Sequence, residues 1–157
     1  MKRDGSPAES LRATGSAAGA GVGNAGSEVG TALVVFADDC SLRRLRPLRR
    51  GFRHCFVAVC SGAGWVICDP LSNRTDLAFV AGASAADLAR WYCGRGLRVV
   101  ETRIAPPPRR PAPVRPYTCV EAVKRVLGIE ARWVLTPWQL YRRLREGAAK
   151  PLTGGRN

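Results

Sequence analysis

Apolar residues divide the chain into a polar start, a central block of short apolar runs and two amphipathic segments near the end. Residues 31–36 (TALVVF) form a continuous apolar run, which predicts a buried strand. Residues 54–59 (HCFVAV) and 65–68 (WVIC) flank the glycine-rich segment SGAG, a pattern typical of a β-hairpin. Residues 77–80 and 97–104 predict two further strands.

Three segments carry the sequence marks of helices. Each begins with a hydroxyl side chain that can accept a hydrogen bond from a free N–H group, followed three positions later by a polar residue. These pairs are Ser84 with Asp87, Thr118 with Glu121, and Thr136 with Gln139. Gly94 and Gly128 predict the ends of the first two helices. The third begins with Pro137 at its first position and is expected to run to about Glu146, after a brief extended piece at residues 133–135.

Strands and helices are mixed without regular β–α–β alternation, so the predicted fold class is α+β, with a small antiparallel sheet packed on helices. Residues 1–29 are rich in glycine, alanine and serine and predict a disordered tail, because they cannot offset the entropy lost on ordering. Residues 30–147 are expected to form a single domain. Within it, residues 105–116 (APPPRRPAPVRP) predict a stiff linker, and residues 148–157 predict a flexible C-terminus.

The large positive net charge of the chain does not by itself identify a binding partner. The 157 residues carry a formal net charge of +13, which favours phosphate-bearing or membrane-surface partners. An excess of arginine with abundant alanine, glycine and proline is also typical of a GC-rich coding sequence. No run approaches the ~18 apolar residues of a membrane span. The first residues lack the apolar stretch of a secretory signal, so a cytoplasmic location is expected.

The chain contains six cysteines and one histidine. In a cytoplasmic protein the thiols are expected to be reduced. No two cysteines have CxxC spacing, and the histidine has no second ligand at metal spacing, so neither a metal site nor a cofactor is expected. The cysteines are Cys40, Cys55, Cys60, Cys68, Cys93 and Cys119.

Cys119 stands out among the cysteines because of its predicted place in a helix. With Thr118 as N-cap, Cys119 is the first helical residue, and its sulfur lies beside free N–H groups at the positive end of the helix dipole. Both features favour the thiolate and lower the thiol pKa below its usual ~8.5. The alternative is that Cys119 is a small core residue facing inward.

His54 begins the first strand of the predicted hairpin, and Asp69 closes the second strand. With a turn centred between Ser61 and Gly62, Asp69 lies directly opposite His54 on the same face. A carboxylate there would orient the imidazole ring and leave its other nitrogen for a thiol. A slip of one residue would place Cys68 opposite His54 instead.

The order of these features along the chain resembles that of one known group of proteins. The features are a histidine at the start of a strand, a glycine-rich turn, a second strand ending in a polar residue, and a later cysteine at a helix start. This order is similar to the circularly permuted NlpC/P60 papain-like group, which includes lecithin:retinol acyltransferase-like proteins. The matching stretches are HCFVAV, WVICD and YTCVEAV, within residues 30–128. Thr118 stands where many members have asparagine, and Asp69 or Cys68 where a second histidine is common.

The resemblance implies a permuted papain-like architecture and a cysteine-dependent hydrolase or acyltransferase. Cys119 would attack an amide, ester or thioester carbonyl of a small acyl or peptide substrate and form an acyl-enzyme. His54 would act as general base and then acid, and Asp69 would orient it. The backbone N–H of Cys119 would form part of the oxyanion hole.

The alternative function is a non-catalytic binding module of the same fold. Residues 43–53 (RRLRPLRRGFR) contain six arginines around Pro47 and Gly51, which predicts a loop. Arg49, Arg50 and Arg53 of this loop would then bind nucleic acid or another polyanion.

Overall fold

The computed structural model describes residues 30–38, 47–106 and 116–148. Five strands and three helices lie in these ranges, which confirms the α+β class. In chain order they are β1 (Thr31–Ala37), β2 (His54–Cys60), β3 (Gly64–Pro70), β4 (Thr75–Ala81), α2 (Ala85–Cys93), β5 (Arg98–Arg103), α3 (Cys119–Leu127) and α4 (Pro137–Ala148). The predicted N-terminal tail, most of the proline-rich linker and the last nine residues lie outside the described residues.

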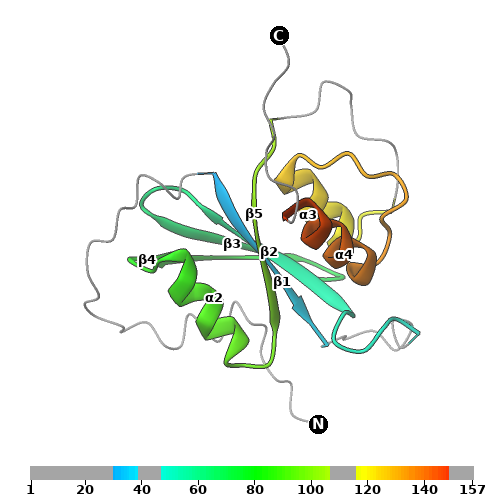
Figure 1. Cartoon of the computed structure of the whole chain (residues 1–157), viewed down its shortest axis with the longest axis horizontal. Helices are drawn as coiled ribbons and strands as arrows, with labels where there is room; N and C mark the ends of the chain where they lie inside the picture. The colour runs from blue at the N-terminus through cyan, green and yellow to red at the C-terminus, as the bar shows by residue number, and fades with distance from the viewer. Residues whose placement is uncertain (1–29, 39–46, 107–115, 149–157) are drawn as a thin grey trace.

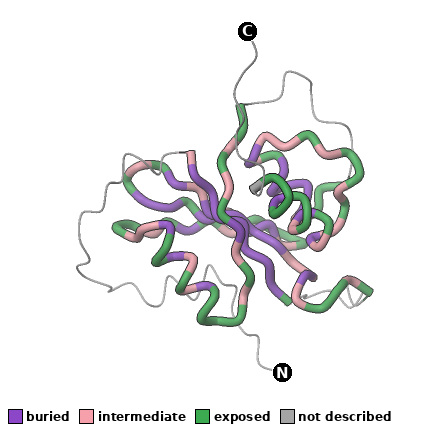
Figure 2. The backbone as a smooth tube through the Cα atoms, viewed as in Figure 1, coloured by how far each residue is buried: buried purple, intermediate pink, exposed green. Residues whose placement is uncertain are grey.

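The strands form one antiparallel sheet in the order β4-β3-β2-β1-β5. Figure 1 shows α2 on one face of this sheet and α3 with α4 on the other. Helices on both faces explain why β1 is a continuous apolar run, since all seven of its residues are buried. The central strands are accordingly the most buried part of the chain (Figure 2).

Two apolar clusters fill the space between the sheet and the helices. The cluster under α2 is built around Leu33, Val35, Phe56, Trp65, Ile67, Leu88 and Tyr92. The cluster under α3 and α4 is built around Val34, Phe36, Cys55, Val57, Val123, Leu127 and Leu140. Neighbouring residues of β1 and β2 therefore alternate between the clusters, as the pleat of a strand requires.

The predicted hairpin register is wrong by two residues. Cys60 pairs with Trp65, and Ser61 N–H donates to the Gly64 carbonyl over 2.8 Å, so the turn is centred between Gly62 and Ala63. The reason is the positive φ of 82° at Gly62. A tight hairpin turn with one left-handed residue needs glycine at its first central position, and here Gly62 supplies it.

This register still leaves Asp69 on the same face as His54. A shift of two residues moves a side chain along the strand without turning it to the other face. Continuing the observed pairing by one step places Asp69 across from Phe56 rather than His54. Cys68, the alternative partner, pairs with Val57 and lies on the opposite face.

The expected extended piece at residues 133–135 is also wrong, since these residues form turns and irregular backbone. The remaining differences are in length. The strand predicted at residues 77–80 spans Thr75–Ala81 as β4, and α4 continues to Ala148.

Candidate active site

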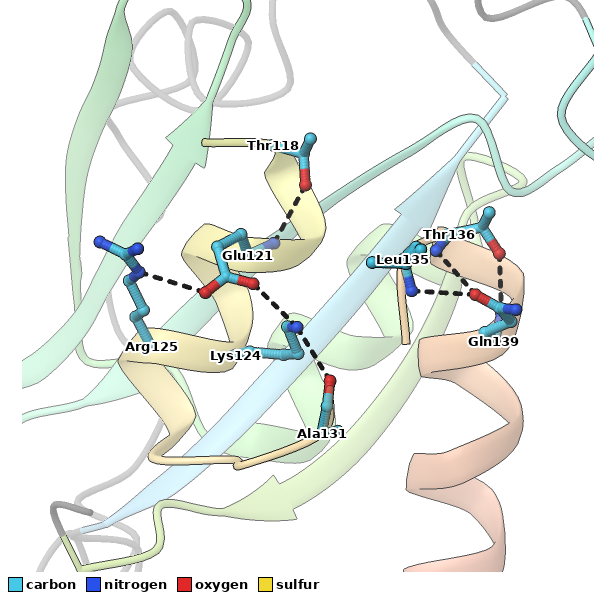
Figure 3. Close-up of polar contacts among 8 residues, drawn as sticks. All are labelled: Thr118, Glu121, Lys124, Arg125, Ala131, Leu135, Thr136 and Gln139. Carbon is cyan, nitrogen blue, oxygen red and sulfur yellow. Dashed lines mark hydrogen bonds and ion pairs between the residues drawn. The ribbon is translucent and has the colours of Figure 1, made fainter. Parts of the chain in front are cut away.

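Thr118 places Cys119 at the start of α3, as Figure 3 shows for the cap. The Thr118 backbone is extended, and its hydroxyl accepts a hydrogen bond from the Glu121 N–H over 3.2 Å. The Thr118 carbonyl accepts the first helical bond, from the Ala122 N–H, over 2.9 Å. Helix geometry leaves the N–H groups of Cys119 and Val120 without an acceptor inside the helix.

A hydroxyl cap followed three residues later by Glu or Gln predicts a capping box, in which each of the two side chains accepts a hydrogen bond from the backbone N–H of the other residue. At α3 only the bond to the Thr118 hydroxyl forms. The Glu121 carboxylate turns along the helix to pair with Lys124 at 2.8 Å and Arg125 at 3.4 Å. Lys124 is buried and also donates to the Ala131 carbonyl over 3.1 Å, which fixes the loop after α3 (Figure 3). Glu121 thus stabilises the helix and the following loop instead of closing its cap.

The second predicted box, at α4, is complete. The Gln139 side chain accepts from the N–H groups of Leu135 and Thr136, and the Thr136 hydroxyl accepts from the Gln139 N–H. Both ends of the loop between α3 and α4 are therefore held by hydrogen bonds.

Asp69 holds one nitrogen of the His54 ring. The His54 Nε2 and Asp69 Oδ1 atoms lie 2.6 Å apart, with Asp69 fully buried and the His54 side chain 15% exposed. Asp69 reaches the ring diagonally across the two strands, a geometry that the two-residue register shift permits. Because Asp69 occupies Nε2, Nδ1 is the ring nitrogen left for a further partner.

Cys119 contacts both His54 and the neighbouring Cys55. The Cys119 sulfur interacts with the Cys55 thiol, the His54 ring and the Cys55 backbone N–H, and each of these interactions lowers the pKa of Cys119. His54 and Cys55 point to opposite faces of the sheet, but both stand at the start of β2. Because both residues with which it interacts stand at the start of β2, Cys119 lies beside the start of this strand and not over its middle.

These contacts favour a thiolate at Cys119 and an imidazolium at His54. The interaction with the Cys55 thiol is the largest effect that lowers the pKa of Cys119, and the His54 hydrogen bond and positive charge lower it further. Together these effects outweigh burial, which raises the pKa, and the pKa of Cys119 falls to about 4. Burial lowers the pKa of His54, but the Asp69 hydrogen bond, the Cys119 hydrogen bond and both negative charges together raise it to about 9. Between these two values the charged pair is the favoured form.

Cys55 is a site residue that sequence reasoning missed. It is fully buried, and burial, followed by its contact with Cys119, raises the pKa of the Cys55 thiol well above its usual value. Cys55 therefore stays protonated and acts as a donor to the Cys119 sulfur. Its place next to His54 was the only signal in the sequence, because strand alternation predicts that it faces away from His54.

Tyr92 of α2 is a second fully buried residue whose electrostatics are coupled to Asp69. Its hydroxyl oxygen is buried and makes no hydrogen bond within the described parts of the chain. Burial and then the Asp69 charge raise the pKa of Tyr92 above its usual range. The Asp69 charge that holds His54 is therefore also felt at Tyr92.

The structure does not gather the three arginines that the sequence singled out into one group around a common partner. Arg49 stacks on Trp138, Arg50 is exposed, and Arg53 lies 3.6 Å from Asp38. Residues 43–46 of the arginine-rich segment lie outside the described residues.

Over the described ranges, no three His, Cys, Asp or Glu side chains are grouped so as to hold a metal ion. None of the helices there is long and apolar enough to cross a membrane. Comparison of the chain with protein-family models, with curated proteins and with solved structures finds no match.

Proposed function

We propose that the chain is a cysteine-dependent hydrolase or acyltransferase that acts on an amide, ester or thioester. The observation that carries the proposal is the chain of contacts from Asp69 through His54 to Cys119 at the start of α3. A nucleophile, a base within hydrogen-bond reach and a third group that orients the base are the parts that acyl transfer through a thiol requires. This order of parts is also what the resemblance to permuted papain-like enzymes implies.

Acylation follows from the charged form of the pair. The Cys119 thiolate attacks the carbonyl carbon, and the carbonyl oxygen gains negative charge. The unpaired N–H groups of Cys119 and Val120 at the helix start are the donors proposed to stabilise that oxyanion. His54 then gives its Nδ1 proton to the leaving amine, alcohol or thiol, and the acyl group remains on Cys119 as a thioester.

Deacylation uses the same residues in the reverse sense. Neutral His54 takes a proton from water, or from an acceptor alcohol or amine, as this nucleophile attacks the thioester. The Cys119 thiolate leaves, and His54 becomes an imidazolium again. Asp69 keeps Nε2–H bonded throughout, so that Nδ1 faces the reacting atoms in both steps.

The test is the trapping of an acyl-enzyme on the full chain with p-nitrophenyl acetate. We expect a burst of nitrophenolate, one acetyl group on Cys119 by peptide mass mapping, and slower turnover afterwards. Cys119→Ala should lose the burst, whereas Cys93→Ser, which removes an exposed thiol of α2, should keep it. Acetylation spread over several cysteines, or a burst that survives Cys119→Ala, would overturn the proposal.

A further inference from the structure

Three arginines from separate parts of the chain meet on one group of aromatic rings. Arg49 precedes β2, Arg98 begins β5 and Arg145 lies in the last turn of α4. The rings are those of Phe52, Trp138 and Tyr141, whose centroids lie 4.7, 4.8 and 5.6 Å from one another. We call these six residues the arginine–aromatic platform.

Each arginine lies over a different ring of the platform. The guanidinium carbon lies 3.7 Å from the Trp138 centroid for Arg49, 4.8 Å from Phe52 for Arg98, and 5.8 Å from Tyr141 for Arg145. Arg145 also donates to the Tyr141 hydroxyl over 3.2 Å. These cation–π contacts restrain the guanidinium groups before any ligand arrives, which reduces the entropy lost on binding.

Gly51 shows how closely Arg98 is packed into the platform. A Cβ atom at Gly51 would lie only 2.2 Å from Arg98 Nη1, and Gly51 has a positive φ of 78°. A side chain at position 51 would therefore displace the guanidinium.

The platform is not neutralised by the described part of the chain. No carboxylate there lies within ion-pair distance of Arg49, Arg98 or Arg145, and all three residues are exposed. Glu146, which follows Arg145 in sequence, pairs instead with Arg142 at 3.5 Å, and Asp38 is engaged by the Gly51 N–H and by Arg53. Like charges held together without a counterion favour an anionic ligand.

We propose that the arginine–aromatic platform binds the phosphate backbone of single-stranded nucleic acid. The guanidinium N–H groups that are not bonded within the platform match the geometry of phosphate oxygens. The outer face of a guanidinium can stack on an unpaired base, which a duplex does not offer. A membrane surface fits less well, because Phe52 is buried and Trp138 and Tyr141 are half-buried, so no ring of the platform is fully exposed for insertion.

This inference is independent of the proposed acyl transfer and has its own test. Fluorescence anisotropy of a labelled 20-nucleotide DNA strand would measure binding to the full chain at several salt concentrations. Loss of three phosphate contacts should reduce the log–log salt slope by about 2 and weaken binding about 100-fold at 0.1 M salt. We expect this for the triple variant R49Q/R98Q/R145Q.

The matched control is R74Q/R90Q/R95Q, which removes the same charge from the β3–β4 turn, from α2 and from the segment that follows α2, away from α4 (Figure 1). It includes Arg95, which also stacks on a ring, at 3.4 Å from the Trp91 centroid. Circular dichroism and thermal melting would verify that both triples are folded. An equal loss of affinity in both would overturn the proposal, because net charge alone would then explain binding.

Two further arms test the chemistry of the platform. Replacing the same three arginines by lysine keeps the charge but removes the planar fork, so affinity should fall while most of the salt slope remains. A lysine triple that binds as tightly as the unaltered chain would contradict the stacked geometry. The R49Q/R98Q/R145Q variant would also be tested for binding to phosphatidylserine vesicles. If this variant lost vesicle binding but bound the DNA strand as tightly as the unaltered chain, the nucleic-acid assignment would be overturned.

Discussion

The pH dependence of Cys119 reactivity follows directly from its contacts. The perturbation is pH itself, and the probe is a pyridyl disulfide, which reacts only with thiolates. With a pKa of about 4, Cys119 is about 90% thiolate at pH 5, whereas a thiol with the ordinary pKa of 9.0 is about 0.01% thiolate. Thiolate population alone therefore favours Cys119 by about 10⁴-fold at pH 5.

Intrinsic nucleophilicity works in the opposite direction. A Brønsted coefficient of about 0.45, applied over a pKa difference of about 5, makes the Cys119 thiolate roughly 200-fold less nucleophilic. The net advantage over an ordinary thiol is about 50-fold at pH 5 and disappears near pH 7. Above that pH Cys119 should be the slower thiol.

Stopped-flow kinetics on the full chain, with glutathione measured in parallel, would test this expectation. The phase lost in Cys119→Ser should have a nearly constant rate between about pH 5 and 8 and should fall below pH 5. The glutathione rate should rise about tenfold per pH unit over the same range. A Cys119 phase that also rises tenfold per unit would refute the reasoning.

Three further predictions concern single residues around the site. Cys55→Ala should raise the pKa of Cys119, because it removes the thiol donor; the pKa would be measured with the same pyridyl disulfide probe. Cys55→Ser keeps a donor, so the pKa of Cys119 should rise less in this variant. Asp69→Asn should reduce ester turnover by about 10²–10⁴-fold with folding intact by circular dichroism, because an amide no longer selects the productive tautomer of His54; unchanged turnover would remove Asp69 from the mechanism. Thr118→Ala should cost about 1 kcal/mol in the free energy of unfolding by urea titration, and Thr118→Ser much less, since serine preserves the bond to the Glu121 N–H; equal losses would contradict the cap.

The local features of the site were predictable from the sequence. The Thr118 cap depends on residues within one helical turn, so its pattern predicts the position of Cys119 directly. The shared face of His54 and Asp69 was expected for one of two registers, since a slip of one residue would have placed Cys68 on that face instead. The observed register was not predicted, because the turn is centred between Gly62 and Ala63, one position later than the centre expected between Ser61 and Gly62.

The non-local features could not be predicted from the same patterns. Cys55 meets Cys119 only because α3 approaches the start of β2, and nothing in either segment specifies that approach. The platform is similar, because Arg98 and Trp138 are distant in sequence and stack around Phe52 only after β5 and α4 have packed together. The sequence predicted one arginine cluster in residues 43–53, whereas the structure places Arg49, Arg50 and Arg53 in different surroundings.

The most direct measurement of the Cys119–His54 pair uses the single histidine of the chain. Long-range ¹H–¹⁵N spectroscopy gives one set of imidazole signals, which can be followed from about pH 4 to 11 in the unaltered chain and in Cys119→Ser. We predict that His54 stays protonated until about pH 9 and that its midpoint falls when the thiolate is removed. A midpoint near the ordinary value of 6.5 in both proteins would contradict the thiolate–imidazolium pair.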